Sequence, residues 1–414
     1  MRQNKKIRLL IVGMSESIHT ARWISNITDQ GWELHLFPSN DIGATHSLLQ
    51  NITVHHSFFG KQYNNKARIR GIPVISQNIA WLFRTILKHY FSSYRARQLA
   101  RLIRKIKPDL IHLMEIQAAG YLMLEAKKYL RQLCPPWILT AWGSDIYLFG
   151  RLPEHKQKIQ QVLEQSAFYL CECNRDITLA KQFGFHGVTF PCFPVTGGFD
   201  LAKIQPLREI ISPSQRRYII VKGYQGWSGR ALVALQALRR CVDVLQNYTI
   251  ILYAVEKSIW AQSSAVEIAA KLLAKDTGCK VEFIPCGTPY EKLLEYFAKS
   301  RVYLGLSISD GISVSMLEAL VTGAFPIQSN TSCANEWIID GVTGFIVPPE
   351  DPEDVEQAIR KALNDDILVD NATKQNWKTA KQRLDSTLIK QQTLSFYRNI
   401  ISKTHTSDKG KEGK

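Results

Sequence analysis

The 414-residue chain lacks several patterns that would assign it to a functional class at once. Its eight cysteines form no Cys-x-x-Cys pair and no His/Cys cluster of the kind that holds a structural metal. No apolar run approaches the roughly 18 residues that a membrane-spanning helix needs. These absences disfavour a zinc-binding domain and a transmembrane protein, and we expect reduced cysteines in a cytosolic protein. Cys171 and Cys173 lie in an apolar run, where we expect buried free thiols.

Acidic residues are missing from the whole segment Ile42–Pro108, which contains 12 Lys and Arg residues. Residues 1–108 hold 17 Lys and Arg but only 4 Asp and Glu, so most of the formal net charge of +16 lies there. Within this region Ile79–Tyr94 mixes bulky apolar, aromatic and basic side chains in the way expected at a bilayer interface. A solvated basic face over core aromatics is the simplest interpretation, and nucleic acid is disfavoured because no recognised binding motif accompanies the charge. We favour an anionic membrane surface or an anionic lipid substrate as the partner.

Strand-like and helix-like segments alternate along the first half of the chain, which predicts an α/β fold with a parallel sheet. Two prolines and two glycines between Phe190 and Asp200 interrupt this alternation, which restarts at Tyr218. Two comparable halves of about 200 residues are expected for an enzyme with two Rossmann-like domains. The predicted strands are Ile7–Val12, Glu33–Phe37, Leu110–Leu113, Trp137–Ala141 and Phe168–Cys171, then Tyr218–Val221, Thr249–Tyr253, Lys280–Ile284, Val302–Leu306 and Ala324–Ile327.

The segment Gly305–Pro349 carries the most informative pattern in the chain. Asp310 lies in a turn after a predicted strand, and Glu318 lies in the helix predicted over Val314–Val321. The two acids then border one pocket at a helix N-terminus, where free backbone N–H groups and the helix dipole favour a phosphate. Carboxylates hold sugar hydroxyls, so the pocket suits a nucleotide-sugar, which contains both groups. The alternative is a capping box of Ser315 and Glu318 that only satisfies backbone donors.

A second loop, Lys222–Arg230, lies between a predicted strand and a predicted helix. Its three glycines allow close approach of the backbone to a ligand, and a cation stands at each end. This arrangement suits a diphosphate, whose charge must be neutralised as it departs. A glycine-rich loop with a lysine is also common at helix starts, so the loop is weak evidence by itself.

The segment after Gly305 resembles the donor-binding segment of family 4 glycosyltransferases, which are retaining enzymes of the GT-B fold. The matching residues are Asp310, Gly311, Leu317, Glu318, Ala319, Gly323, Glu336, Gly341, Gly344 and Val347, and the family usually has Glu where this chain has Asp310. The resemblance implies two Rossmann-like, doubly wound domains that face a central cleft. It places an acceptor domain at 1–195, a donor domain at 196–385, a helix at 386–403 that crosses back to the first domain, and a disordered tail at 404–414.

The resemblance also implies transfer of a hexosyl unit from a nucleoside diphosphate sugar to an acceptor hydroxyl, with retention at the anomeric carbon. In such an enzyme Asp310 would hold hydroxyls of the donor sugar and Glu318 would hold the ribose. Two cations and several backbone amides would bind the diphosphate: Lys222 and Arg230, with Gly13, Gly311, Ile312 and Ser313. The family fold needs no divalent metal, the chain has no Asp-x-Asp motif, and we expect no cofactor besides the donor substrate.

Five residues that follow strands of the first domain are candidate contacts of the acceptor or the sugar: His19, His112, Glu115, Trp142 and Asp145. Many family members have a His that contacts the donor sugar where this chain has Trp142, so stacking on a sugar ring and packing in the core are both open. His112 or Glu115 would act as a base toward the acceptor hydroxyl, although a lone His is more often structural. His19 also suits a surface position, and Asp145 also suits the N-cap of the next helix.

We therefore expect a glycosyltransferase whose acceptor is lipid-linked or a polysaccharide, in envelope or exopolysaccharide biosynthesis. The enzyme would lie in the cytoplasm, peripherally attached to an anionic membrane surface, with no transmembrane segment and no nucleic-acid partner. A nucleotide-sugar epimerase of the same fold and a non-catalytic membrane-surface protein remain as alternatives.

Overall fold

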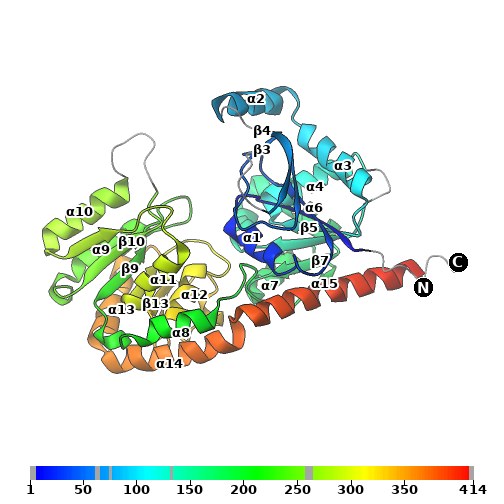
Figure 1. Ribbon diagram of the computed structural model, residues 1–414. Helices are drawn as coiled ribbons and strands as arrows, with labels where there is room; N and C mark the ends of the chain where they lie inside the picture. The colour runs from blue at the N-terminus through cyan, green and yellow to red at the C-terminus, as the bar shows by residue number, and fades with distance from the viewer. Residues whose placement is uncertain (1–5, 61–65, 74–76, 131–133, 257–263, 410–414) are drawn as a thin grey trace. The chain divides into compact units, whose positions relative to one another are not determined.

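The chain folds into two compact units, each built around a parallel sheet. The computed structural model describes residues 6–60, 66–73, 77–130, 134–256 and 264–409. Met1–Gly197 and Leu388–Lys414 form unit 1, and Gly198–Thr387 form unit 2, so the predicted boundary after residue 195 lies two residues early. Figure 1 colours unit 1 blue to teal, with its C-terminal helix in red, and unit 2 green to orange. The predicted architecture of two parallel-sheet α/β domains is confirmed.

The described strands of unit 1 are β1 Arg8–Gly13, β2 Glu33–Pro38, β3 Thr53–Gly60, β4 Arg68–Pro73, β5 Leu110–Met114, β6 Trp137–Ala141, β7 Phe168–Cys171 and β8 Val188–Thr189. They form one parallel sheet in the order β4-β3-β2-β1-β5-β6-β7-β8. Its helices are α1 Ile18–Ser25, α2 Gln77–Tyr90, α3 Tyr94–Ile106, α4 Tyr121–Lys127, α5 Ser144–Tyr147, α6 Pro153–Gln165, α7 Asn174–Gln182 and α15 Ser386–Lys409, whose first two residues still belong to unit 2. A π-helical turn, η1 Ile116–Gly120, precedes α4.

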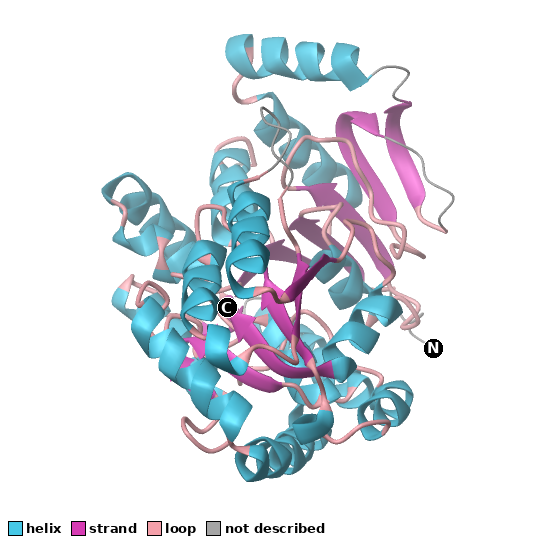
Figure 2. Cartoon of the chain, turned by 90° about the vertical axis from the view of Figure 1, so that its left-hand side faces the viewer, coloured by secondary structure: helices cyan, strands magenta, loops and turns pink. Residues whose placement is uncertain are grey.

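Helices cover both faces of this sheet, so its central strands are apolar at successive positions. Leu10 and Val12 pack into a core that includes residues of α3, α4 and α6. Leu9 and Ile11 point to the other face and pack into a core that includes residues of α1 and α15. Figure 2 shows helices flanking the strands in this layered arrangement.

Unit 2 has a six-stranded parallel sheet among its described residues. Its strands are β9 Tyr218–Lys222, β10 Thr249–Tyr253, β11 Lys280–Phe283, β12 Ser300–Gly305, β13 Phe325–Ser329 and β14 Phe345–Val347, in the order β11-β10-β9-β12-β13-β14. Its helices are α8 Leu201–Glu209, α9 Ala231–Arg240, α10 Ala265–Thr277, α11 Tyr290–Lys299, α12 Val314–Thr322, α13 Pro352–Asn364 and α14 Asp366–Arg383.

In each sheet, the direction in which successive strands are added reverses at one point. In unit 1 the path runs outward from β1 to β4 and resumes on the other side of β1 with β5. In unit 2 it runs outward from β9 to β11 and resumes on the other side of β9 with β12. Doubly wound sheets bind ligands outside the carboxyl ends of the strands at such points, which here are β1/β5 and β9/β12.

The last helix, α15, belongs to unit 1 from Leu388 onward, so the predicted crossing back to the first domain is confirmed. The disordered tail predicted for 404–414 stays a prediction, although the structure describes α15 as far as Lys409. Polar composition did not end this helix, since a helix propagates from an anchored turn more easily than it nucleates. The rest of the predicted tail, 410–414, lies outside the described residues.

Two further expectations concern thiols and membrane spans. All eight cysteines are free, and Cys171 and Cys173 are buried as predicted. Among the described helices, none combines the length and the apolar character that crossing a bilayer requires.

Candidate active site

The two loops of unit 2 that carry the predicted donor residues are joined by backbone hydrogen bonds. β9 and β12 are parallel neighbours, so their carboxyl ends lie at one edge of the sheet. The amide of Arg230 donates to the carbonyl of Leu306 at 3.0 Å, and the amide of Ile308 donates to the carbonyl of Ser228 at 2.8 Å. The structure therefore brings the loop after Lys222 and the loop before α12 together at the switch point of this sheet.

Glu318 lies within α12, and only 5% of its surface is exposed. The helix begins at Val314 with Ser313 as its N-cap residue, so Ser315 does not occupy the N-cap position. The alternative of a Ser315–Glu318 capping box is therefore excluded, because that motif needs the serine at the N-cap. A carboxylate taken out of water at this depth needs polar or charged partners.

The charge of Glu318 contributes to raising the pKa of two tyrosines, Tyr253 and Tyr303. Burial, together with Tyr303 and then Glu318, raises the pKa of Tyr253 well above its ordinary value. Burial is also the main reason that the pKa of Tyr303 is raised, and the charges of Glu318 and Asp310 add to it. Tyr303 lies on β12 and Tyr253 ends β10, so the acids gather over the carboxyl ends of these strands.

Asp310 and the start of α12 form the second part of the site. The half-buried Asp310 accepts a hydrogen bond through Oδ1 from the amide of Gly311 at 2.9 Å. Ser313 makes no side-chain cap hydrogen bond, and the first turn of α12 contains no acidic residue. The first amides of a helix carry partial positive charge, so this end of α12 favours an anion next to Gly311, Ile312 and Ser313.

Buried polar side chains of β12 and β13 lie next to the loop that precedes α12. The Tyr303 hydroxyl lies 3.4 Å from Ser313 Oγ and donates to Gln328 Oε1 at 3.3 Å. A Cβ atom at Gly305 would collide with the same hydroxyl, so the strand needs a glycine at its end. Sequence reasoning missed Tyr303 and Gln328, which lie on β12 and β13.

The two cations of the glycine-rich loop differ in their surroundings. Arg230 Nε donates to Glu350 Oε1 at 2.8 Å, and Nη1 donates to the carbonyl of Gly229. Lys222 is half-buried at the end of β9, beside Tyr253 in the register of the sheet, and forms no ion pair with the described residues. Lys222 is therefore the better-placed cation for a diphosphate, whereas Arg230 would have to exchange its carboxylate partner.

The glycines of this loop are required because larger residues would clash with neighbouring side chains and backbone. A Cβ atom at Gly223 would collide with Val255, and one at Gly226 or Gly229 would collide with Tyr224. Their positions therefore explain the tight loop without requiring a ligand next to each glycine.

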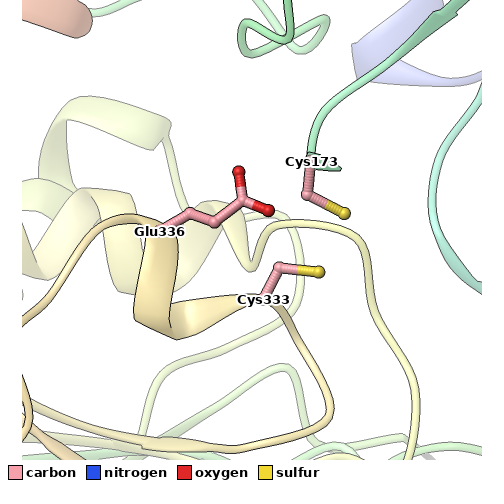
Figure 3. Close-up of side chains that lie close together, drawn as sticks. All are labelled: Cys173, Cys333 and Glu336. Atoms are coloured by element: carbon pink, nitrogen blue, oxygen red, sulfur yellow. The ribbon is translucent and has the colours of Figure 1, made fainter. Parts of the chain in front are cut away.

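Glu336, another residue of the matching pattern, lies in the 3-10 turn Ala334–Glu336 of unit 2. Its N-cap residue, Cys333, has a left-handed backbone with φ of 47°. Figure 3 shows the side chains of Cys333 and Glu336 leaving this turn. The carbonyl of Glu336 accepts a hydrogen bond from Arg383 Nη1 at 2.6 Å, which ties the turn to the end of α14.

In unit 1 the loops after β1 and β6 meet near the switch point. The ring centroids of His19 and Trp142 lie 5.8 Å apart in an edge-to-face arrangement. Gly13 is buried at the end of β1. A Cβ atom built on Gly13 would lie only 3.1 Å from Met114 Cβ. Trp142 also packs against the core cluster of this face, so its ring is partly a core residue.

The structure places His112 in the core of unit 1. Its exposed fraction is 0%, and burial lowers its pKa to about 3. Nδ1 lies 2.6 Å from the Tyr397 hydroxyl, and Nε2 lies 2.6 Å from Thr140 Oγ1. The expectation that His112 contacts the acceptor does not fit, because both ring nitrogens are already engaged in hydrogen bonds.

Glu115 directly follows β5, the strand that pairs with β1, and has φ of 114°, which is unusual for a residue with a side chain. Its Oε1 accepts a hydrogen bond from Ser39 Oγ at 2.6 Å. Burial raises the pKa of Glu115 to about 7, opposed by the hydrogen bond from Ser39 and assisted by the charge of Glu16. Glu115 is therefore a carboxyl at the switch point that titrates near neutrality.

Asp145 connects two loops and does not cap α5. Its Oδ1 accepts from the amide of Trp142 at 2.9 Å, and its Oδ2 accepts from the amide of Ile116 at 3.3 Å. Burial, with the charges of Asp176 and Glu115, raises its pKa to about 8. Asp145 thus holds the backbone next to Trp142 and Glu115 in place.

The comparisons with known proteins agree with this geometry. Residues 8–173 match the family described as Glycosyl transferase 4-like, and residues 263–382 match the family described as Glycosyl transferases group 1. No curated protein matches the chain in sequence.

Solved structures share the fold at low identity. A sucrose-phosphate synthase from Thermosynechococcus elongatus has 14% identity and a TM-score of 0.70, and the alignment covers 96% of this chain and 100% of that one. A trehalose 6-phosphate synthase from Burkholderia multivorans has 12% identity and a TM-score of 0.68, with 96% and 99% covered. The Anabaena protein HepE, solved with UDP-glucose, has 14% identity and a TM-score of 0.61, with 94% and 99% covered. The chain therefore belongs to the glycosyltransferases of the GT-B fold, with a glycosyl transferase 4-like first domain and a glycosyl transferases group 1 second domain.

Proposed function

We propose that the protein is a retaining glycosyltransferase that moves a hexosyl unit from a nucleoside diphosphate sugar to an acceptor hydroxyl. The observation that carries this proposal is the buried Glu318 in α12, with Asp310 beside the same helix start, at the switch point of unit 2. A structural neighbour, HepE, was solved with UDP-glucose, which supports a donor of this class.

In the proposed reaction each group of the donor meets a matching group of the site. The diphosphate lies at the uncapped start of α12, where amides next to Gly311 and the Lys222 ammonium balance the charge that grows on the leaving group. Glu318 accepts hydrogen bonds from the ribose hydroxyls, and Asp310 accepts them from the hexose. Because a cation and helix amides fill the role of a divalent ion, the reaction needs no metal.

The acceptor hydroxyl is proposed to meet unit 1 at Glu115. This carboxyl lies at the second switch point, and its pKa of about 7 allows it to accept a proton near neutral pH. We place the acceptor among lipid-linked or polysaccharide substrates of envelope biosynthesis, with the enzyme attached peripherally to the cytoplasmic face of the membrane. The acid-free, cation-rich segment Ile42–Pro108 supports that location.

The donor assignment is tested by a thermal-shift screen of nucleotide-sugars on the full chain and on Glu318→Gln. We expect one nucleotide-sugar to raise the melting temperature of the native protein, and the variant to lose most of that rise. Transfer by the variant should fall at least about 10- to 100-fold, because a hydrogen bond to a charged group contributes roughly 1.5–3 kcal/mol. Glu291→Gln, an exposed position on α11, is the matched control and should behave like the native protein.

Two outcomes would contradict the proposal. A Glu318→Gln variant that is destabilised but retains full transfer would reduce Glu318 to a structural role. Conversion of the donor when no acceptor is present would indicate the epimerase of the same fold.

A further inference from the structure

Helix α2 exposes an apolar stripe. Its exposed large apolar residues recur at spacings of three and four and so share one face of the helix. They are Ile79, Leu82, Phe83, Ile86 and Tyr90, with exposed fractions of 67%, 54%, 39%, 47% and 72%. Phe91, just after the helix, is 62% exposed. The side chains of Trp81 and Lys88 lie outside the described part of the chain.

The opposite side of α2 attaches it to unit 1. Ala80 is buried, and Arg84 reaches the carbonyl of Phe59 on β3 through Nη2 at 3.1 Å. Arg84 Nε also lies 3.7 Å from a carboxylate oxygen of Asp41. Figure 1 shows α2 next to β3 and β4, at the edge of the sheet of unit 1. Phe83, the least exposed residue of the stripe, also packs edge-to-face against Phe58 and Phe59 of β3, with ring centroids 5.4 Å apart in both pairs. Polar contacts and this one ring therefore hold the helix, and the other residues of the stripe stay exposed.

Two cations that the sequence suggested for a membrane surface are used inside the fold. Arg84 makes the contacts just described, and Arg95 donates from Nη1 to the carbonyl of Ser39 at 2.8 Å and from Nε to Ser57 Oγ at 3.2 Å. Burial lowers the pKa of Arg95, as expected for a guanidinium inside the protein. Exposed cations elsewhere on α3 must supply any contact with an anionic surface.

A cavity of about 420 Å³ opens where α2 meets α3. Phe58, Tyr90 and Phe91 contribute aromatic walls, and Arg97 and Arg101 contribute two exposed guanidinium groups from successive turns of α3. Ser92, Ser93 and Gln98 add polar side chains to the lining. The cavity thus has hydrogen-bonding cations and aromatic surface directly beside the apolar stripe of α2.

We propose that this cavity binds the phosphate group of an anionic membrane lipid while the apolar stripe of α2 lies in the bilayer interface. Guanidinium groups bind phosphate oxygens through paired hydrogen bonds, and aromatic rings favour the headgroup level of a bilayer. An amphipathic helix lies in that interface with its apolar face toward the acyl chains. The inference rests on the proposed membrane location and adds the site that recognises the lipid.

A second copy of the chain is a less suitable occupant of the stripe. Pairing two such faces would bring two sets of arginines together in a region whose sequence holds no acid from Ile42 to Pro108. Like charges brought together at an interface oppose association, whereas an anionic surface neutralises them.

The test is flotation of the full-length protein with vesicles of three compositions at matched concentration. One is neutral phosphatidylcholine, and the others add phosphatidylglycerol or phosphatidic acid at equal surface charge. Arg97→Gln with Arg101→Gln removes the cavity cations. The matched control, Arg104→Gln with Lys105→Gln, removes two exposed charges further along α3, outside the cavity lining. A third variant, Leu82→Ser with Ile86→Ser, interrupts the stripe.

We expect the native protein to bind both anionic vesicles and not to bind neutral vesicles. The affinity of the Arg97/Arg101 variant for anionic vesicles should fall on the order of tenfold or more, since each cation at such a surface contributes about 1 kcal/mol. The Arg104/Lys105 control should lose clearly less, and the stripe variant should detach from anionic vesicles. Equal losses in the two charge variants would overturn the cavity while leaving membrane attachment intact. No binding to any vesicle would overturn both, and a stripe-dependent dimer in sedimentation velocity would assign the stripe to a second copy. Donor-induced thermal shifts, recorded on the same variants, report on the transferase separately.

Discussion

Glu115 combines a positive φ, a place at the switch point of unit 1 and a pKa of about 7. The strained backbone orients the carboxyl at the end of β5, where Ser39 donates to it. Strained residues and shifted pKa values both concentrate at functional sites. For these reasons Glu115 is the residue of unit 1 whose replacement is most informative about the acceptor.

The catalytic efficiency toward the acceptor should rise as the pH increases through about 7, because the ionised Glu115 accepts the hydroxyl proton. Glu115→Gln should remove this rise and lower transfer about 100-fold or more. Ser39→Ala is the companion variant: it removes a hydrogen bond that favours the ionised carboxyl, so the rise should move to higher pH. An unchanged pH profile in Glu115→Gln would assign the titration to another group.

Candidate residues in local patterns were easier to select than residues whose contacts are distant in sequence. Asp310 and Glu318 were proposed as donor residues because an acid in a turn and an acid in the next helix form a local pattern. For His112 the sequence left a structural role and an acceptor contact open, because its partner, Tyr397, lies 285 residues further along the chain. Arg84 and Arg95 were counted as surface charges for the same reason, since the carbonyls that bind them come from distant segments.

At the scale of elements, the predicted strands agree with the observed ones to within about two residues, because continuous apolar runs between glycines and prolines mark buried parallel strands. Four strands were not predicted: β3, β4, β8 and β14. β3 contains two adjacent histidines and β4 contains Arg68 and Arg70, so both resemble polar segments, whereas β8 and β14 are only two and three residues long. Helix α12, which carries the proposed donor site, was predicted because a turn precedes it and Gly323 ends it in a left-handed conformation.

A buried hydroxyl of α15 connects this helix to two side chains of unit 1. The Tyr397 hydroxyl accepts from Trp23 Nε1 at 2.9 Å and lies 2.6 Å from His112 Nδ1. Tyr397→Phe should therefore destabilise the protein by about 1–3 kcal/mol, since two buried polar groups lose their partner. Chemical denaturation would measure this loss.

Tyr248→Phe, at a half-buried position of unit 2, is the matched control and should leave the midpoint nearly unchanged. The donor-induced thermal shift should survive in Tyr397→Phe, because the donor residues lie in unit 2. Equal stability of the two variants would show that the hydroxyl contributes little.

At the scale of the whole molecule, the property that the sequence revealed most directly is the concentration of positive charge in residues 1–108. The cations of residues 1–108 lie in unit 1, whereas the proposed donor residues Asp310 and Glu318 lie in unit 2. Two family matches, one in each unit, agree with this division of labour. The sequence did not show which cations remain at the surface, because that depends on contacts between distant segments.

Transfer should persist in excess EDTA, because Lys222 and the amides at the start of α12 are proposed to balance the diphosphate. The measurement compares initial rates with EDTA, without EDTA, and after magnesium or manganese is added back. Lys222→Gln should lower the rate in all three conditions. A complete loss in EDTA that magnesium or manganese restores would refute the metal-free assignment.

The position of α15 has a consequence for how the protein is made. Ile389, Phe396, Tyr397 and Ile400 complete a core that otherwise consists of residues before 196. Unit 2 is one continuous segment of the chain, but unit 1 cannot be completed until α15 has left the ribosome. During synthesis the N-terminal half therefore carries an open apolar surface while the second half folds. A nascent chain stalled before Leu388 should bind chaperones, and one released after Lys403 should not.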